Sequence, residues 1–213
     1  MDMEAFRLVF GSGNALKARP PCRRLVSDAD LEVVLTLCWR YRPRTFVEIG
    51  VFAGWTSREV LKDSPWVERY VGVDLAPDKL APECLAQLTV VGLGPEKEPG
   101  RLAKRDPRFE MVLLDGPDAL RPEMVAPADM VFIDGDHRYE AVRRDTAVAR
   151  AALRDGAGIL TWYDCRASPD VRRYVDERDA EGWPPPVVRV DEANVCFEIV
   201  GKGCVGRKED GHG

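Results

Sequence analysis

The amino-acid sequence predicts a doubly wound α/β fold, in which a mostly parallel seven-stranded sheet carries helices on both faces and ends in an antiparallel hairpin. Short apolar runs rich in β-branched and aromatic residues alternate with segments whose apolar residues recur at helical spacing. This alternation is typical of a parallel sheet covered by helices. The last two apolar runs have no helical segment between them. Such a pair predicts an antiparallel hairpin at the edge of the sheet.

The strands are expected where apolar runs are bounded by turn residues. They cover residues 45–49, 70–73, 109–114, 130–133, 158–162, 187–190 and 195–200. The helices are expected at about 27–42, 56–62, 80–91, 138–154 and 169–180. The first helix has the clearest boundaries, since Ser27 and Asp30 match a capping box with Asp in place of Glu, and Pro43 marks the end.

The chain of 213 residues suits one domain with a substantial core. Residues 1–26 are expected to form an extended N-terminal lead-in, and residues 27–200 the domain itself. The polar, glycine-rich residues 201–213 are expected to be a mobile tail.

Charge and cysteine content exclude several classes of protein. The net charge is −5, which argues against a broad nucleic-acid-binding surface. No apolar run approaches the ~20 residues of a membrane helix, and the N-terminus lacks the pattern of a secretory signal. We therefore expect a cytoplasmic protein without nucleic-acid or membrane partners. The six cysteines form no Cys-x-x-Cys pair, so reduced thiols are expected, and with only two histidines a zinc site has little support.

The most informative segment joins the first two strands. The first strand ends near Glu48, Gly50 and Gly54 follow, and the second strand ends at Asp74. This layout is typical of a βαβ unit that holds a nucleoside, because glycines let the backbone approach a ligand and the second acid can accept hydrogen bonds from ribose. The glycines do not match G-x-G-x-x-G, which argues against a pyrophosphate. An ordinary βαβ unit, with glycines used only for the turn, is the alternative.

A second group of residues follows the fourth strand. Asp134, Gly135, Asp136 and His137 come directly after the apolar run 130–133. Ligands in doubly wound sheets bind beyond the carboxyl ends of the strands, where strand order reverses. If the first and fourth strands are central neighbours, Gly50 and Asp134 face the same crevice.

Residues 48–54, Glu-Ile-Gly-Val-Phe-Ala-Gly, resemble the first motif of class I S-adenosylmethionine-dependent methyltransferases, and Ile-Asp-Gly-Asp-His-x-Tyr resembles the fourth-strand motif of a small-molecule subset. The resemblance covers about residues 27–200. It implies a Rossmann-like fold and transfer of a methyl group from S-adenosylmethionine to a small-molecule acceptor, at a hydroxyl oxygen. It also implies a donor site of Glu48, Gly50, Gly54, Asp74 and Asp115. Asp74 would bind ribose, and Asp115 would meet the adenine amino group, with Asp118 as a competitor.

The resemblance also suggests how a hydroxyl could be activated. In the metal-dependent O-methyltransferases of this family, acids at the ends of the fourth and fifth strands hold Mg²⁺, and Asp134 and Asp164 match those positions. Tyr163 and Cys165 flank Asp164, however, and neither suits Mg²⁺. His137 is the candidate general base because its ordinary pKa is near neutral. A structural role for His137, and a metal-free role for Asp134, stay open.

Two other functions compete with methyl transfer. A non-catalytic nucleoside-binding module is favoured by the incomplete motif around Asp164. A nicotinamide-dependent oxidoreductase shares the strand–helix–strand–acid layout, although it lacks support from the glycine spacing. The identity of the acceptor and the oligomeric state, with a homo-oligomer among the alternatives, do not follow from the sequence.

Overall fold

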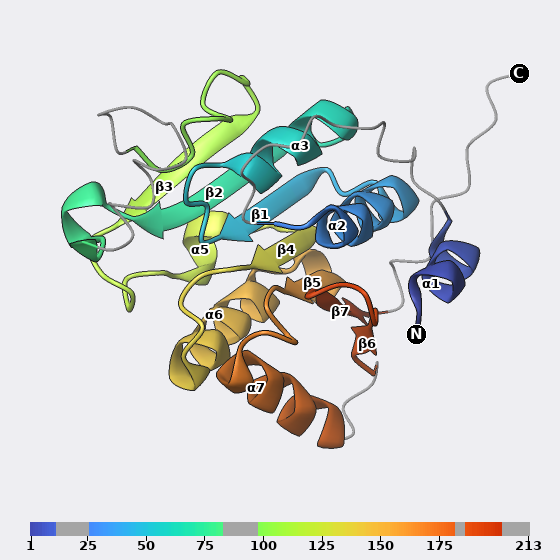
Figure 1. The fold of residues 1–213 in the computed structure, drawn as a ribbon. Helices are drawn as coiled ribbons and strands as arrows, with labels where there is room; N and C mark the ends of the chain where they lie inside the picture. Colours follow the sequence, from blue (N-terminus) through green and yellow to red (C-terminus); the bar gives the residue numbers. More distant parts are fainter. Residues whose placement is uncertain (12–25, 83–97, 182–185, 202–213) are drawn as a thin grey trace, which may run out of the picture.

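The computed structural model describes residues 1–11, 26–82, 98–181 and 186–201. Its centre is a seven-stranded sheet in the order β3-β2-β1-β4-β5-β7-β6 (Figure 1). The five strands from β3 to β5 are parallel, and β7 pairs antiparallel with both β5 and β6. The strands are β1 Thr45–Ile49, β2 Arg69–Leu75, β3 Phe109–Leu114, β4 Met130–Ile133, β5 Gly158–Trp162, β6 Val188–Arg189 and β7 Cys196–Val200. The predicted fold class, the terminal hairpin and the pairing of the first and fourth strands are confirmed.

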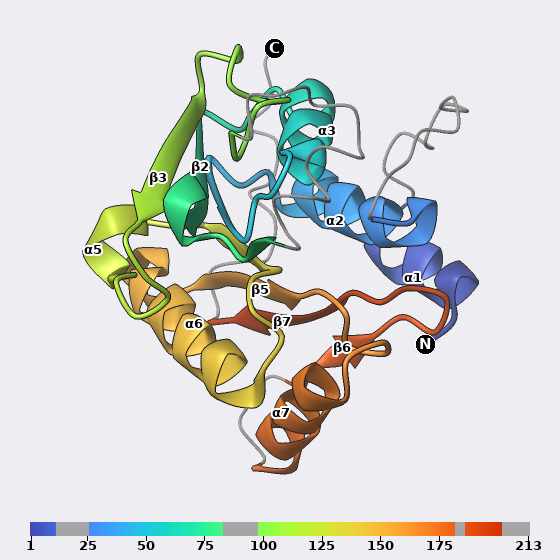
Figure 2. The same ribbon diagram turned by 60° about the vertical axis from the view of Figure 1, so that its left-hand side comes forward.

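Helices cover both faces of the sheet, as Figures 1 and 2 show. One core cluster joins α1 Met3–Phe10, α2 Asp28–Tyr41 and α3 Trp55–Asp63 to one face. The other cluster joins α5 Pro122–Val125, α6 Tyr139–Ala152 and α7 Pro169–Ala180 to the opposite face. Two short 3₁₀ helices complete the described elements, η1 Pro77–Lys79 and η2 Arg154–Gly156. The predicted helix at 80–91 and the predicted tail fall mostly on residues outside the described ranges.

The N-terminal lead-in differs from the prediction, because its first residues form the helix α1. The Asp2 carboxylate accepts a hydrogen bond from the Ala5 backbone N–H and caps the helix. The rings of Phe6 and Phe10 pack edge-on against Phe197 of β7. A short helix gains most of its stability from such packing. Because the partner lies almost two hundred residues away in the chain, the local sequence does not reveal it.

The α2 helix begins as predicted. Ser27 and Asp30 form a complete capping box, in which each side chain accepts a hydrogen bond from the other residue's backbone N–H. Asp30 is fully buried, and it also accepts a hydrogen bond from the backbone N–H of Asn194 in the loop before β7. The capping residue therefore also connects α2 to the C-terminal hairpin.

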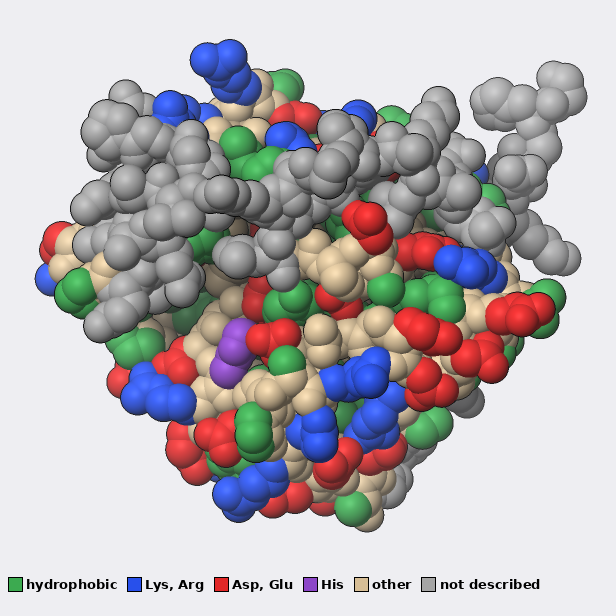
Figure 3. All heavy atoms as spheres, in the orientation of Figure 1, with side chains coloured by type: hydrophobic (Ala, Val, Ile, Leu, Met, Phe, Trp, Pro, Cys, Tyr) green, Lys and Arg blue, Asp and Glu red, His purple; other side chains and the backbone are tan. Residues whose placement is uncertain are grey.

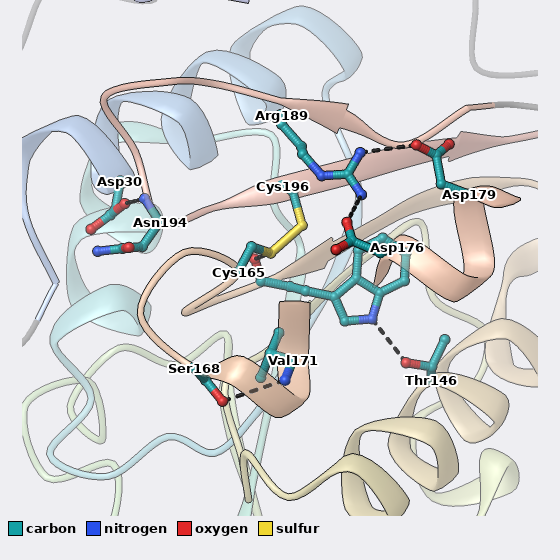
Figure 4. Close-up of a disulfide and its surroundings, with 11 residues drawn as sticks. Asp30, Thr146, Cys165, Ser168, Val171, Asp176, Asp179, Arg189, Asn194 and Cys196 are labelled. Atoms are coloured by element: carbon teal, nitrogen blue, oxygen red, sulfur yellow. Dashed lines mark hydrogen bonds and ion pairs between the residues drawn. A yellow bond between two sulfur atoms is a disulfide. The ribbon is translucent and has the colours of Figure 1, made fainter. Parts of the chain in front are cut away.

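The expectation of reduced thiols is wrong for two cysteines. Cys165 and Cys196 form a disulfide (Figure 4). Cys38 is a buried free thiol. Strand pairing is the physical reason. Trp162 lies opposite Cys196 in the β5–β7 ladder, so the loop after β5 passes beside the start of β7. This neighbourhood depends on which strands pair, and sequence spacing does not indicate it. The other three cysteines lie outside the described residues.

Among the residues that the structure describes, no helix is both long and apolar enough to cross a membrane.

Candidate active site

A cavity of about 780 Å³ opens at the carboxyl ends of the parallel strands. Six of the eight residues predicted for the site line it, namely Glu48, Gly50, Asp74, Asp134, His137 and Asp164. They come from four neighbouring strands, β2, β1, β4 and β5, and from the turns that follow them. Figure 3 shows acidic side chains gathered around a histidine on this face of the molecule. The strand order thus brings together residues that are more than 100 positions apart in the sequence.

Gly50 sits where the turns after β1 and β4 meet. Its φ is +89°, and a Cβ at this position would lie 2.5 Å from the carbonyl carbon of Asp134 and 2.7 Å from the Cα of Gly135. Its backbone N–H donates to the carbonyl of Val73 on β2. Only glycine satisfies both the conformation and the close approach. Gly50 therefore sets how closely the strand ends pack beneath the cavity.

Gly54 has a different role from the one predicted. It adopts φ +84° as the N-cap of α3, and it packs against the backbone of Gly100. It does not line the cavity, although its neighbours Ala53 and Trp55 do. Gly54 therefore acts by turning the chain into α3. Thr56, in the first turn of that helix, is buried and lines the cavity. It was not predicted, because no motif in the sequence marks it.

Asp74 holds the turn after β1. Its carboxylate accepts hydrogen bonds from the backbone N–H groups of Phe52 and Leu75, each at 2.7 Å. Burial raises the pKa of Asp74, while these N–H groups act in the opposite direction. A carboxylate oxygen has two lone pairs, so both oxygens of Asp74 can accept a further hydrogen bond from a ligand in the cavity.

Glu48 is the most deeply buried acid of the site, with 1% of its surface exposed. The hydroxyls of Ser57 and Tyr70 both donate to its Oε2, the latter at 2.8 Å. Burial raises the pKa of Glu48 to about 8, although the two hydroxyls act in the opposite direction. Glu48 is therefore an anchor between β1, β2 and α3, in addition to lining the cavity.

The pKa of Glu48 gives a prediction for stability. An acid whose pKa is higher in the folded state lowers stability as the pH rises from its unfolded pKa, about 4.5, to its folded pKa, about 8. Glu48→Gln removes this titration, so the melting temperature of the variant relative to the wild type should rise between pH 5 and pH 8. Glu68→Gln is the control, because the Arg44 guanidinium holds the pKa of Glu68 below its ordinary value and the difference should not rise. If the melting temperature of Glu48→Gln relative to the wild type is constant from pH 5 to pH 8, Glu48 does not have a raised pKa in the folded state.

His137 lies between two carboxylates. Its Nε2 is 3.4 Å from Oδ1 of Asp134, and its Nδ1 is 3.4 Å from Oδ2 of Asp164. The hydrogen bond with Asp134 raises the pKa of His137, and the charge of Asp164 adds to this effect. Burial raises the pKa of Asp134 to about 7 and also raises the pKa of Asp164. The imidazole is half-exposed at the cavity, so both its nitrogens are oriented by acids while the ring faces the ligand space.

Asp115 is not brought together with the other predicted residues. It is exposed and does not line the cavity, whereas Leu114 and Pro117 on either side do. Its competitor Asp118 is exposed and pairs with Arg144, a cavity residue that donates at 2.7 Å. A contact between Asp115 and adenine therefore stays a prediction. Arg144 was not predicted, because an arginine on a polar helix face looks solvated in the sequence.

The residues predicted for Mg²⁺ do not form a metal site in the described part of the chain. No group of three or more His, Cys, Asp or Glu side chains there has a metal-binding arrangement. Asp134 and Asp164 both face His137, whose ring lies between them. Of the residues next to Asp164, Tyr163 is a poor ligand for a hard cation and Cys165 is committed to the disulfide. The donor set therefore does not fit Mg²⁺ as it is arranged.

A seven-stranded sheet edged by a hairpin, with a cavity lined by Gly50 after β1 and by Asp74 on β2, is the arrangement of class I S-adenosylmethionine-dependent methyltransferases. The comparisons with known proteins agree. A model of the family described as "Methyltransferase domain" matches residues 47–164, which is more than half of the chain. The chain belongs to this methyltransferase family. A search of curated proteins found no match.

Solved structures share the fold. The SAH-bound methyltransferase PaMTH1 of Podospora anserina matches with a TM-score of 0.56 and 12% identity, over 84% of this chain and 80% of that one. The cofactor-bound Rv0187 from MTB matches with a TM-score of 0.50 and 19% identity, over 77% of each chain. At these identities the likeness concerns the architecture, and the family match carries the assignment.

Proposed function

We propose that the protein transfers the methyl group of S-adenosylmethionine to a hydroxyl oxygen of a small molecule. The observation that carries this proposal is the placement of His137 between Asp134 and Asp164 at the edge of the cavity that Asp74 lines. The sulfonium donor is already activated, so the protein has to orient the acceptor and accept one proton. An imidazole that is oriented by carboxylates suits that task.

The cavity offers places for the two polar ends of the donor. We assign the two ribose hydroxyls to the carboxylate oxygens of Asp74, which lines the cavity. The N-terminus of α3 begins beside Thr56, and no side chain in the described ranges caps it. Free N–H groups at a helix N-terminus favour a carboxylate. The amino-acid end of S-adenosylmethionine carries one.

The reaction then needs a single proton transfer. The acceptor hydroxyl gives its proton to Nδ1 of a neutral His137, while Nε2 carries the hydrogen that is bonded to Asp134. The acceptor oxygen forms a bond to the methyl carbon, and the carbon–sulfur bond breaks with its electron pair kept by sulfur. Asp134 and Asp164 stabilise the imidazolium that results. Tyr163 also lines the cavity, and we assign to it the orientation of the acceptor. No step is assigned to a metal ion.

His137→Gln should lower kcat by about 100-fold, because a positioned general base contributes at least that much. The neighbouring acids raise the pKa of His137 above 6.5, and only the neutral ring can accept a proton. Activity should therefore rise with pH to a midpoint above 6.5. Asp164→Asn should move that midpoint down, since one of the two charges is lost. If the midpoint is the same in Asp164→Asn as in the wild type, a group other than His137 is responsible for the pH dependence.

The overall proposal is tested in two stages. Isothermal calorimetry with S-adenosylmethionine, S-adenosylhomocysteine and NADH measures the cofactor preference, and tighter binding of NADH would favour the oxidoreductase instead. A panel of hydroxylated acceptors, each with EDTA or with Mg²⁺, then measures turnover. Donor binding without any product would favour the non-catalytic module, and turnover only with Mg²⁺ would show that a cation, and not His137 alone, activates the hydroxyl. A cytoplasmic location and a homo-oligomer stay predictions.

A further inference from the structure

We propose that the Cys165–Cys196 disulfide is a positioning device for the active site: it holds Asp164 against His137, so that cleavage by a dithiol loosens this contact and slows methyl transfer. The inference rests on the proposed function of His137. Neither cysteine lines the cavity, but Cys165 directly follows Asp164 in the chain. Figure 4 shows the bond between the loop after β5 and the start of β7.

Asp164 occupies an unusual backbone conformation directly before the disulfide. Its φ is +57°, which is uncommon for a residue other than glycine. Its carbonyl accepts a hydrogen bond from Ser168 at 2.8 Å, while the N–H of Tyr163 donates to Ile133 on β4. A residue in this region of backbone space persists when its surroundings fix it. The residues on both sides of Asp164 are therefore what determines where its carboxylate points.

On the C-terminal side, the disulfide provides the strongest of these constraints. Cys196 is fully buried and belongs to β7, which pairs with β5 over five residue pairs. Besides the disulfide, Cys165 has one described backbone bond to the same hairpin, from its N–H to the carbonyl of Asn194 at 2.9 Å. The covalent bond therefore holds Cys165, the residue after Asp164, at a fixed position beside β7.

Other charged and titratable groups face this contact, and we expect them to stay in place when the disulfide is cut. Asp134 and Asp136 act on His137 from the β4 side. Asp30 of α2 acts on Asp164, and it accepts a hydrogen bond from the hydroxyl of Tyr163. Because Asp134 remains 3.4 Å from the ring, loss of the Asp164 contact should lower the pKa of His137 only part of the way toward its ordinary value. The expected change is thus a decrease in the pKa of His137 that comes from the loss of the Asp164 contact.

The cleavage is an ordinary thiol–disulfide exchange. One thiolate of dithiothreitol attacks a sulfur of the pair and releases the other cysteine as a thiol. The second thiol of the reagent then closes a ring and releases the first cysteine, so the protein disulfide gains two electrons and two protons, and the dithiol is oxidised.

The test is an NMR titration of His137 in the protein without donor or acceptor. The wild type is measured with and without dithiothreitol, beside the Cys165→Ala/Cys196→Ala double variant and Asp164→Asn, and the resonance is assigned with His137→Gln. We expect the reagent and the double variant to lower the pKa of His137 in the wild type. We expect no further change on adding the reagent to Asp164→Asn or to the double variant. Turnover of the reduced wild type should fall about tenfold, as for a slightly misplaced catalytic group.

Several outcomes would overturn the proposal. One is an unchanged pKa of His137 in the reduced wild type, and another is an equal change in Asp164→Asn, which would mean that the disulfide acts by some other route. Cys38→Ala is the control for the remaining described thiol and should respond to the reagent like the wild type. Global unfolding on reduction, seen by circular dichroism, would show that the bond stabilises the whole domain and not the Asp164 contact. Because the titration uses no substrate, it gives its answer even if no methyl acceptor is found.

Discussion

Gly50→Ala is expected to lower the free energy of unfolding by about 4 kcal/mol or more and to abolish donor binding. The new methyl group would meet the backbone at Asp134 and Gly135, which cannot move away as a flexible side chain could. The strand ends of β1 and β4 would have to separate, and the floor of the cavity would change with them. Urea denaturation measures the stability, and calorimetry with S-adenosylhomocysteine measures the binding.

Two other glycines separate the causes of this effect. Gly116 has no atom within 4 Å of an added Cβ, so Gly116→Ala should change stability by less than about 0.5 kcal/mol. Gly156 has the same open space but a φ of +69°, so Gly156→Ala should cost about 1 kcal/mol through backbone conformation alone. If Gly50→Ala lowers the free energy of unfolding by no more than Gly156→Ala does, the turns after β1 and β4 do not approach each other as closely as described.

Asp74→Ala is expected to weaken the binding of S-adenosylmethionine by roughly 1000-fold. Two hydrogen bonds from ribose hydroxyls to a charged acceptor are together worth about 4 kcal/mol, which corresponds to that factor. The substitution also removes the acceptor for the Phe52 and Leu75 N–H groups, so the turn after β1 loses its support. Calorimetry measures the affinity, and the melting temperature of the free protein reports the second effect.

Asp74→Asn and Asp78→Ala are the matched variants. Asn keeps the size of the side chain but loses the charge, so the affinity should fall less than for Asp74→Ala. Asp78 is exposed on the 3₁₀ helix that follows the same strand and pairs with Lys79, so its loss should leave the affinity nearly unchanged. Wild-type affinity in Asp74→Ala would show that the ribose lies elsewhere.

The acidic character of the cavity favours a donor that carries positive charge. Glu48, Asp74, Asp134 and Asp164 line it, and burial raises the pKa of each of them. Buried carboxylates are costly unless an opposite charge is near. A sulfonium and an ammonium group supply such charges, so donor binding should lower these pKa values and release protons. These carboxylates would repel an anionic acceptor, which argues for neutral acceptors.

Much of the fold followed from local patterns in the sequence. The runs at 45–49 and 130–133 were recognisable because buried parallel strands are mostly apolar. Glu48 within the first run and Asp134 directly after the second stand out against them. Six of the eight predicted site residues line the cavity for the same reason: parallel strands of one sheet end at one edge. The capping box of α2 was equally local, since both of its residues lie within one turn.

What the sequence determined by itself was therefore the set of elements and the chemistry at their ends, because both depend on neighbours within a few positions. Only the tertiary structure decided the rest. It joined Cys165 to Cys196, packed α1 on Phe197, placed His137 between two acids and left Asp115 outside the cavity. Each of these depends on which strand lies beside which, or on how a turn is oriented, and long-range packing settles both.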